Sequence, residues 1–290
     1  TRFILASGAT NLADGIAVVA WAWVATLLSR DPLLVAMMPV ALRLPWALCA
    51  IPAGIITDRV DRRRLILAMD LLRGVAFAVA ALALWGAMPL DDAPARGTSS
   101  PVLFLLLLGC ATLVGLAEVF RDNAAQTILP SIVDKQHLEH ANGRLWSIEL
   151  IGNALVGPAL GAFLIATSLP LPFALNAAAY LAALVLVARL TGSFRPAQRQ
   201  TRNWRTELHE GYGFLIASPL LKTLALITGM WNLLFQIKSI ALVLHVQENF
   251  GVGATAYGLI LPGAAIGGIL GSLAAPRIIA VLGPARTAQI

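Results

Sequence analysis

The sequence predicts an all-α membrane protein with eight membrane-spanning helices. Only 12% of its 290 residues are charged, about half of the share that is usual in a soluble domain. The mean hydropathy is +0.79, and 58% of the residues are hydrophobic. The apolar residues also come in long blocks, and about 20 of them suffice to cross the hydrocarbon core of a bilayer. A soluble protein with buried helices does not need blocks of this length.

The eight blocks predict helices with connections of alternating character. They cover residues 3–28, 33–56, 65–87, 102–119, 145–166, 172–190, 220–246 and 254–274. The connections 29–32, 91–100 and 168–170 carry few charges, whereas 54–64, 121–144 and 189–222 are basic. On this division, 17 of the 21 Lys and Arg residues fall on the side of the 54–64 loop, and Arg43 and Lys238 lie inside helices. The positive-inside rule therefore predicts a cytoplasmic N-terminus.

Residues 191–219 are the predicted linker between two parts of the chain. Trp204, Leu208, Tyr212 and Leu215 recur there at helical spacing, which predicts an amphipathic helix along the inner membrane surface. A solvated linker is the alternative. An offset of 217 residues relates Asp31 to Glu248, Pro45 to Pro262 and Gly54 to Gly271 across this linker. The offset predicts a parallel repeat, a plan known in transporters.

Ionisable groups at membrane depth are costly and call for a role. Asp14 lies about 16 Å and Arg43 about 20 Å from the inner face at 1.5 Å per residue. Either they form a structural ion pair, or Asp14 faces a water-filled cavity and binds a proton or a cationic substrate. Glu149 either pairs with Arg144 or exchanges protons in the cavity. Lys238 is a counter-ion or reaches the outer face.

The fifth predicted helix combines small residues with a proline. Gly152, Gly157 and Gly161 allow close helix approach, and Pro158 favours a bend. Other polar or amphipathic side chains at membrane depth are candidates for a substrate path or, for the tryptophans, interfacial anchors: Asn11, Trp21, Trp23, Asn153, Asn232 and Gln236. The sequence has no catalytic motif, no nucleotide-binding loop and no metal-ligand spacing, so we expect no enzyme activity, cofactor or metal.

The 54–64 loop resembles the signature loop of the major facilitator superfamily, G-x-x-x-D-R-x-G-R-[RK]. Gly54, Asp58, Arg59, Arg62 and Arg63 match this pattern. Asp61 replaces its second glycine, as in exporters of the enterobactin and macrolide type. Residues 129–142 and 208–211 are similar to the same branch. The stretch from Gly157 to Ala162 resembles the antiporter motif G-P-x-x-G-G of drug exporters.

The resemblance implies the major facilitator fold, with twelve helices in two six-helix bundles around a central cavity, and alternating access. Eight of the twelve helices are then present. Residues 1–190 form the N-terminal bundle and residues 220–290 the first two helices of a truncated C-terminal bundle. The matching loop residues serve gating, and Arg59 pairs with an acid at the inner end of the fourth helix, where Asp122 is placed.

We therefore expect an antiporter that exports an amphipathic, drug-like molecule from a bacterial inner membrane. Asp14 and Glu149 are the predicted proton carriers, and Arg43 tunes Asp14. The expected partners are the lipid bilayer, a small-molecule substrate and protons, with no nucleic acid, and we expect a monomer. Two alternatives remain: the same fold with a siderophore or lysophospholipid as cargo, and a membrane scaffold or sensor without transport.

Overall fold

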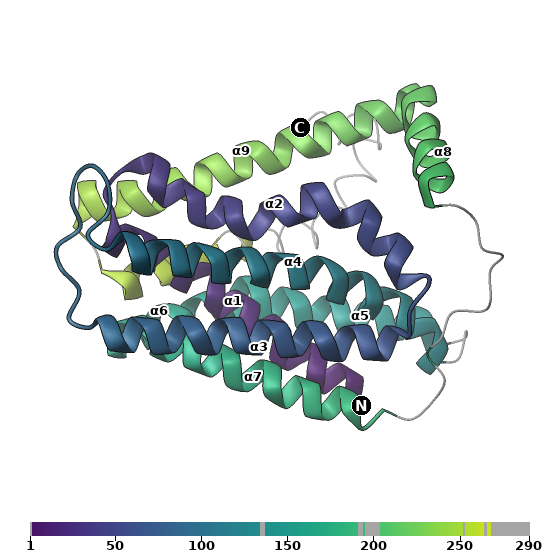
Figure 1. Ribbon diagram of the computed structural model, residues 1–290, viewed down its shortest axis with the longest axis horizontal. Coiled ribbons are helices and arrows are strands. Elements are labelled where there is room, and N and C mark those ends of the chain that lie inside the picture. Colours follow the sequence, from purple (N-terminus) through teal and green to yellow (C-terminus); the bar gives the residue numbers. More distant parts are fainter. Residues whose placement is uncertain are drawn as a thin grey trace.

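The computed structural model describes residues 2–133, 137–190, 194, 204–251, 253–263 and 266–267, and no strand occurs among them. The elements are α1 (Arg2–Leu28), α2 (Pro32–Thr57), α3 (Arg62–Ala87), α4 (Pro101–Ile132), α5 (Leu138–Glu149), the π-helical η2 (Leu150–Val156), α6 (Gly157–Thr167), α7 (Leu171–Ala188), α8 (Trp204–Ala217) and α9 (Pro219–Phe250). Figure 1 shows the long helices side by side along one axis. We call the end with the 54–64 loop the inner end, and the opposite end the outer end.

Seven helical stretches in the described part of the chain are long and apolar enough to cross a membrane, which confirms the predicted all-α membrane class. Two predictions about them need correction. The fourth helix does not stop at residue 119 but continues as α4 to Ile132. The fifth is not one α-helix but α5, η2 and α6 in succession. The eighth predicted helix lies partly outside the described residues and is helical at 254–263.

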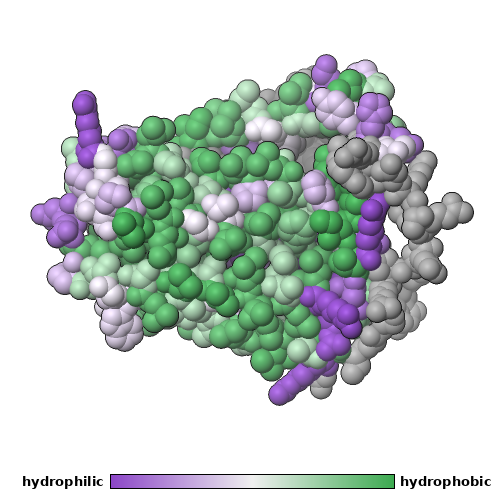
Figure 2. Space-filling model, viewed as in Figure 1, coloured by the Kyte–Doolittle hydropathy of each residue, from purple (hydrophilic) through white to green (hydrophobic). Residues whose placement is uncertain are grey.

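The visible face of the molecule has the surface that a bilayer requires. Apolar side chains cover the middle of this face, and hydrophilic side chains gather at its two ends (Figure 2). The helix expected in the linker is present as α8, and it crosses the inner end of the bundle (Figure 1). Its position on the membrane surface stays a prediction, as does the division of the chain into two bundles.

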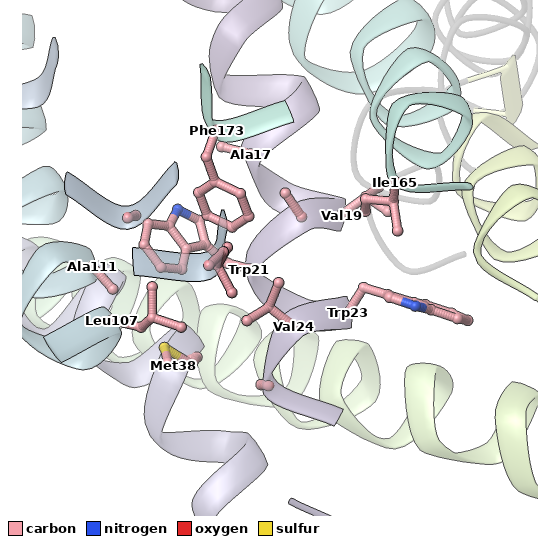
Figure 3. Packing of buried hydrophobic residues seen from close by; sticks show 14 of the residues in the cluster. Ala17, Val19, Trp21, Trp23, Val24, Met38, Leu107, Ala111, Ile165 and Phe173 are labelled. Atoms are coloured by element: carbon pink, nitrogen blue, oxygen red, sulfur yellow. The ribbon is translucent and has the colours of Figure 1, made fainter. Parts of the chain in front are cut away.

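The core is built around α1, the most buried of the seven candidate spans. Trp21 packs edge-on against Phe173 of α7 at 4.8 Å and lies 5.9 Å from Phe77 of α3. Figure 3 shows its indole among Leu107 and Met38 as well. These contacts fix the rotation of α1, because a large ring in the core admits few orientations. Trp21 is therefore a packing residue and does not lie at the membrane interface or along a cavity.

Asp61 has a local structural role at the inner end. It is the N-cap of α3, and its carboxylate accepts a hydrogen bond of 3.0 Å from the backbone N–H of Arg64. An aspartate satisfies one of the unpaired N–H groups at a helix start, which a glycine cannot do through a side chain. This accounts physically for the departure from glycine in the signature pattern.

The Asp61 cap leads to a stability prediction. Asp61→Ala should lower the free energy of unfolding by about 1 kcal/mol, the usual cost of losing an N-cap side chain. Asp61→Asn should retain most of it, because an amide oxygen also accepts the bond. Thermal unfolding of the purified protein in detergent measures both. Asp91→Ala, in the exposed outer loop, is the control, and equal effects of Asp61→Ala and Asp91→Ala would contradict the capping role.

The outer half of α9 closes against α1 and α2. Gln247 donates a hydrogen bond of 2.9 Å to the Thr26 hydroxyl and accepts one of 2.8 Å from Arg30. Val243 and Val246 are buried beside them. The inner half of α9 is exposed, and Figure 1 shows α9 diverging from α2 toward the inner end. Among the described residues, α9 thus packs against α1 and α2 near the outer end, and the side chains of its inner half are exposed.

The same contact bears on the predicted repeat. Arg30 and Gln247 are 217 residues apart, the offset proposed from the sequence. The same offset carries the start of α1, Arg2, to the start of α9, Pro219. Two equivalent residues touch when they lie on the axis that relates two parallel repeats. On the predicted repeat, this contact would place the outer ends of α1 and α9 close to such an axis, and the repeat itself stays a prediction.

Candidate functional site: a charged cavity open along the bundle

One face of the bundle contains a cavity of about 530 Å³. It is bounded by α1, α2, α4, α5 and η2. Its lining is Phe3, Ser7, Asn11, Asp14, Arg43, Trp46, Glu118, Arg121, Asp122, Ala125, Gln126, Leu129, Asn142, Leu145, Trp146, Glu149 and Asn153. The volume suits a drug-sized molecule, since ligand sites measure about 300–1,000 Å³. The predicted carriers Asp14 and Glu149 and the predicted cation Arg43 all line it.

Asp14 is hydrogen-bonded to neighbouring helices through one carboxylate oxygen, and its side chain is partly exposed at the cavity. Its Oδ1 accepts hydrogen bonds from both Arg73 and Tyr180. Arg73 lies over the Tyr180 ring at 4.3 Å, and that ring stacks on Phe77 at 5.7 Å. The Asp14 side chain is 21% exposed, against 1% for Arg73. Its Oδ2 has no hydrogen-bond partner among the described residues, so this oxygen can accept a proton or a cation from the cavity.

The pairing of Arg43 differs from the expected one. The sequence suggested Asp14 as its partner, but the structure pairs Arg43 with Glu118 of α4 at 3.1 Å. The second oxygen of Glu118 lies 3.8 Å from Arg73. Arg43 comes from α2 and its side chain is 53% exposed, so it presents a positive charge to the cavity. Within the ranges that the structure describes, Asp14 and Arg43 make no direct ion pair and are linked by the contacts of Arg73 and Glu118.

A second arginine pairs deep in the bundle. Arg121 of α4 contacts Asp70 of α3 at 3.2 Å and donates to the Thr10 hydroxyl at 2.9 Å. It also lies 3.4 Å from its neighbour Asp122, whose carboxylate faces the cavity. The Asp70 side chain is fully buried, so its charge requires such a partner. These bonds join α1, α3 and α4 at the level of the cavity.

Glu149 stands where α5 passes into η2. The π-helical segment ends at Val156, two residues before Pro158, which lacks the N–H that an α-helix would use. Asn153 of η2 donates a 3.3 Å hydrogen bond to Asn11 of α1, and both line the cavity. The bend predicted from Pro158 thus takes the form of a π-helical turn, a feature frequent at functional sites. Asn153 within this turn thus contacts α1, and Glu149 just before the turn lines the same cavity.

Comparison with known proteins decides the family. Residues 2–288 match the family model described as transmembrane secretion effector. The chain belongs to this family of the major facilitator superfamily. It is 28% identical over 289 residues to the multidrug efflux pump Tap of Mycolicibacterium fortuitum, covering 93% of this chain and 64% of Tap. The chain thus spans less than two thirds of the length of that relative.

A solved structure agrees at the level of the fold. A bacterial homologue of the iron transporter ferroportin, in an inward-facing state, superposes with a TM-score of 0.63. Its sequence identity is 19%, and the match covers 97% of this chain and 68% of that chain. The family and the candidate spans together make this chain a multi-pass membrane protein of the major facilitator superfamily. The recognition made from the 54–64 loop is confirmed.

The signature loop of this chain joins α3 to the ends of α4 and α7 at the inner end. Arg62 donates to the Thr127 carbonyl near the end of α4 at 3.1 Å. Arg63 donates to the carbonyls of Val187, at 3.2 Å, and Ala188 at the end of α7. Arg63 thus bonds the carbonyl of Ala188, the last residue of α7, where a helix leaves its carbonyl groups without intrahelical partners. In this structure the arginines of the loop therefore hold the inner ends of α3, α4 and α7 together.

The remaining loop residues keep their predicted status. Asp58 ends α2 and lies 4.0 Å from Arg62, with a half-exposed side chain. Gly54 has open space where a side chain would begin. The pairing of Arg59 with Asp122 and the gating role of the loop stay predictions.

Two of the candidate polar groups on α9 are not among the residues that line the cavity. The Lys238 ammonium lies 4.3 Å over the ring of Phe235 on the same helix, and Lys238 is exposed. Asn232 donates to the carbonyl of Thr228. The two roles predicted for Lys238, a counter-ion or a side chain that reaches the outer face, stay predictions. The side chain of Gln236 lies outside the described residues.

Four of the groups that organise the site were missed from the sequence: Asp70, Arg73, Arg121 and Tyr180. The charge count had assigned Arg73 and Arg121 to the inner side, yet both are buried within α3 and α4. The position of Arg73 in the sequence could have indicated this burial, because Arg73 is 11 residues from the start of α3, about 16 Å at 1.5 Å per residue. This depth equals the depth predicted for Asp14. The described residues hold no group of three or more His, Cys, Asp or Glu side chains that could bind a metal ion.

Proposed function

We propose that this transporter exports amphipathic cationic molecules in exchange for protons. The observation that carries the proposal is the charge balance at the cavity. Five acids and three arginines meet there, so two acids exceed the arginines: Asp14, Asp70, Glu118, Asp122 and Glu149 against Arg43, Arg73 and Arg121. Excess acids at membrane depth need protons or a cation to balance them. A site that accepts either one, but not both, couples their movements.

The indoles of the cavity support an amphipathic cargo. Trp46 and Trp146 line the same space as the acids, and Trp146 is 70% exposed. Flat aromatic faces attract organic cations and also pack against their apolar parts. The relative Tap, a multidrug efflux pump, supports this choice over a siderophore or a lysophospholipid. A scaffold or sensor role is not favoured by the family match.

Alternating access is supported by the asymmetry of the α9 seam. Gln247 closes it at the outer end, and the inner half of α9 stands away from α2. We propose that this arrangement presents the cavity to the cytoplasm, and that the opposite arrangement opens it outward. The proposal places the N-terminus in the cytoplasm of a bacterial cell, in agreement with the basic inner loops. It also takes the working unit as a monomer, because the cavity lies within one chain.

The test is compound-driven proton release. The protein in liposomes that enclose a pH-sensitive dye receives tetraphenylphosphonium as the probe cation, and a panel of neutral and anionic compounds. Wild type should move protons in the direction opposite to that of the cation. Asp14→Asn or Glu149→Gln should reduce this movement at least about tenfold, because a contact with a charged group is worth about 1.5–3 kcal/mol.

Matched measurements separate mechanism from misfolding. Asp92→Asn, in the exposed outer loop, should transport like wild type. Each variant is checked by thermal unfolding before the flux is compared. If Asp14→Asn and Glu149→Gln both retain wild-type proton movement, neither residue is a carrier. Cation export without proton movement in wild type would make the protein a uniporter.

A further inference from the structure

Four charged side chains form an alternating row across α1, α3, α4 and α2. Asp14 bonds Arg73, Arg73 lies 3.8 Å from Glu118, and Glu118 lies 3.1 Å from Arg43. The two carboxylate oxygens of Glu118 face different arginines, Oε1 toward Arg43 and Oε2 toward Arg73. Glu118 therefore contacts both arginines, and its contact with Arg43 is the shorter of the two.

Arg73 is the member of this row whose side chain is buried and cannot be hydrated. Its side chain is 1% exposed, and its Nε and Nη1 are buried without hydrogen-bond partners among the described groups. Only Nη2 is engaged, by Asp14 and more distantly by Glu118. A buried guanidinium needs a carboxylate partner, because an unpaired charge in the interior is costly. If Asp14 becomes neutral, the nearest remaining carboxylate is Glu118.

Arg43 is the member that can move. Its side chain is half exposed in the cavity, so it loses little hydration free energy if Glu118 leaves it. The side chains that face Asp14 and Glu118 from the surrounding elements are Arg43 of α2, Arg73 of α3, Arg121 and Asp122 of α4, Glu149 of α5 and Tyr180 of α7. Of the arginines in this set, Arg121 is already bonded to Asp70.

We propose that Arg73 is a positioning residue that transmits the protonation of Asp14 to the Arg43–Glu118 pair. A proton from the cavity adds to Oδ2 of Asp14, and no other bond forms or breaks covalently. Arg73 then shifts its contact from Asp14 to Glu118, and Glu118 releases Arg43. Loss of the proton reverses each step. The inference rests on the proposed function only in taking Asp14 as the group that binds the proton.

The exchange has two consequences for transport. Arg43 and Glu118 join α2 to α4, so protonation of Asp14 removes one bond between these helices. It also leaves the charge of Arg43 unbalanced in the cavity, where it repels a bound cation. Arrival of a proton would therefore expel the cargo without requiring that both compete for one oxygen.

The test is a double-mutant cycle that needs no cargo. Arg43→Gln, Glu118→Gln and the double variant are compared by melting temperature, first with Asp14 present and then in the Asp14→Asn background. With Asp14 present, the two effects should be non-additive by about 2–4 °C, as expected for contacting charges. In the Asp14→Asn background, the non-additive change in melting temperature should be less than half of the value measured with Asp14 present. In the Asp92→Asn background, this non-additive change should equal the value in wild type.

A second measurement covers the case in which Asp14→Asn with Glu118→Gln does not fold. The destabilisation caused by Arg43→Gln should decrease on acidification in otherwise wild-type protein. Tyr180→Phe should move the pH of this decrease, because the Tyr180 hydroxyl bonds Asp14 and not Glu118. Equal non-additivity in both backgrounds, its absence with Asp14 present, or a transition that Tyr180→Phe leaves in place overturns the relay. Proton flux is measured separately, so a failure of the transport proposal is recognised independently.

Discussion

Arg73→Gln should destabilise the protein by about 3–5 kcal/mol, the cost of removing one partner from a buried ion pair. Arg73 is 1% exposed, and its loss leaves Asp14 with only the Tyr180 hydrogen bond. The variant should also lose coupled transport, because nothing then fixes Asp14 beside Glu118. Thermal or denaturant unfolding in detergent gives the first quantity, and dye-reported proton release from liposomes gives the second.

Two companion variants make this prediction specific. Arg64→Gln lies on the same helix but is exposed, and should stay within about 0.5 kcal/mol of wild type. Asp14→Asn added to Arg73→Gln should recover stability, because no unpaired charge then remains in the pair, but it should not recover proton coupling. If Arg73→Gln is as stable as Arg64→Gln, Arg73 does not form the buried ion pair with Asp14 that the structure shows. Recovery of transport by the double variant would exclude Asp14 as carrier.

The helices and the cavity could largely be predicted from the sequence, whereas the pairing of the charges could not. Hydropathy located seven of the spans, and polar residues at membrane depth located Asn11, Asp14, Arg43, Glu149 and Asn153, all of which line the cavity. Partners depend on how each helix is rotated about its axis. That rotation is set by packing, as at Trp21, and hydropathy does not report it.

The depth of each charged residue along its helix would have predicted the ion pairs if the helix ends had been predicted correctly. Arg43 is 14 residues from the inner end of α2, and Glu118 is 14 residues from the inner end of α4, about 21 Å for both. Asp14 and Arg73 are 12 and 11 residues into α1 and α3, about 17 Å. Ending the fourth helix at residue 119 placed Glu118 at the surface. The polar sequence after residue 120 concealed three further turns of helix.

Gly157→Ala should have a large effect of a different origin. A Cβ on Gly157 would overlap the carbonyl oxygen of Gly152 in η2 and lie 2.6 Å from the Cα of Gly15, closer than Cβ atoms approach non-bonded neighbours. Both clashes are with backbone, so η2 must change its path and α1 must separate from α6, and overpacking of this kind costs about 1–3 kcal/mol or more. The cost should exceed the gain of about 1 kcal/mol in helix propensity that alanine brings. The crossing also carries Asn11 and Asn153, so the cavity should widen with it.

Gly109→Ala provides the matched control, because Gly109 lies on α4 with open space around the added carbon. It should stabilise the protein by up to about 1 kcal/mol, so the two substitutions are expected to differ in sign. Unfolding in detergent measures the difference, and probe-cation binding to Gly157→Ala reports whether the cavity has changed. If both variants gain stability, the π-helical turn relaxes to accept a side chain. The close crossing of α1 and α6 would then not be what fixes Glu149 and Asn153 at the cavity.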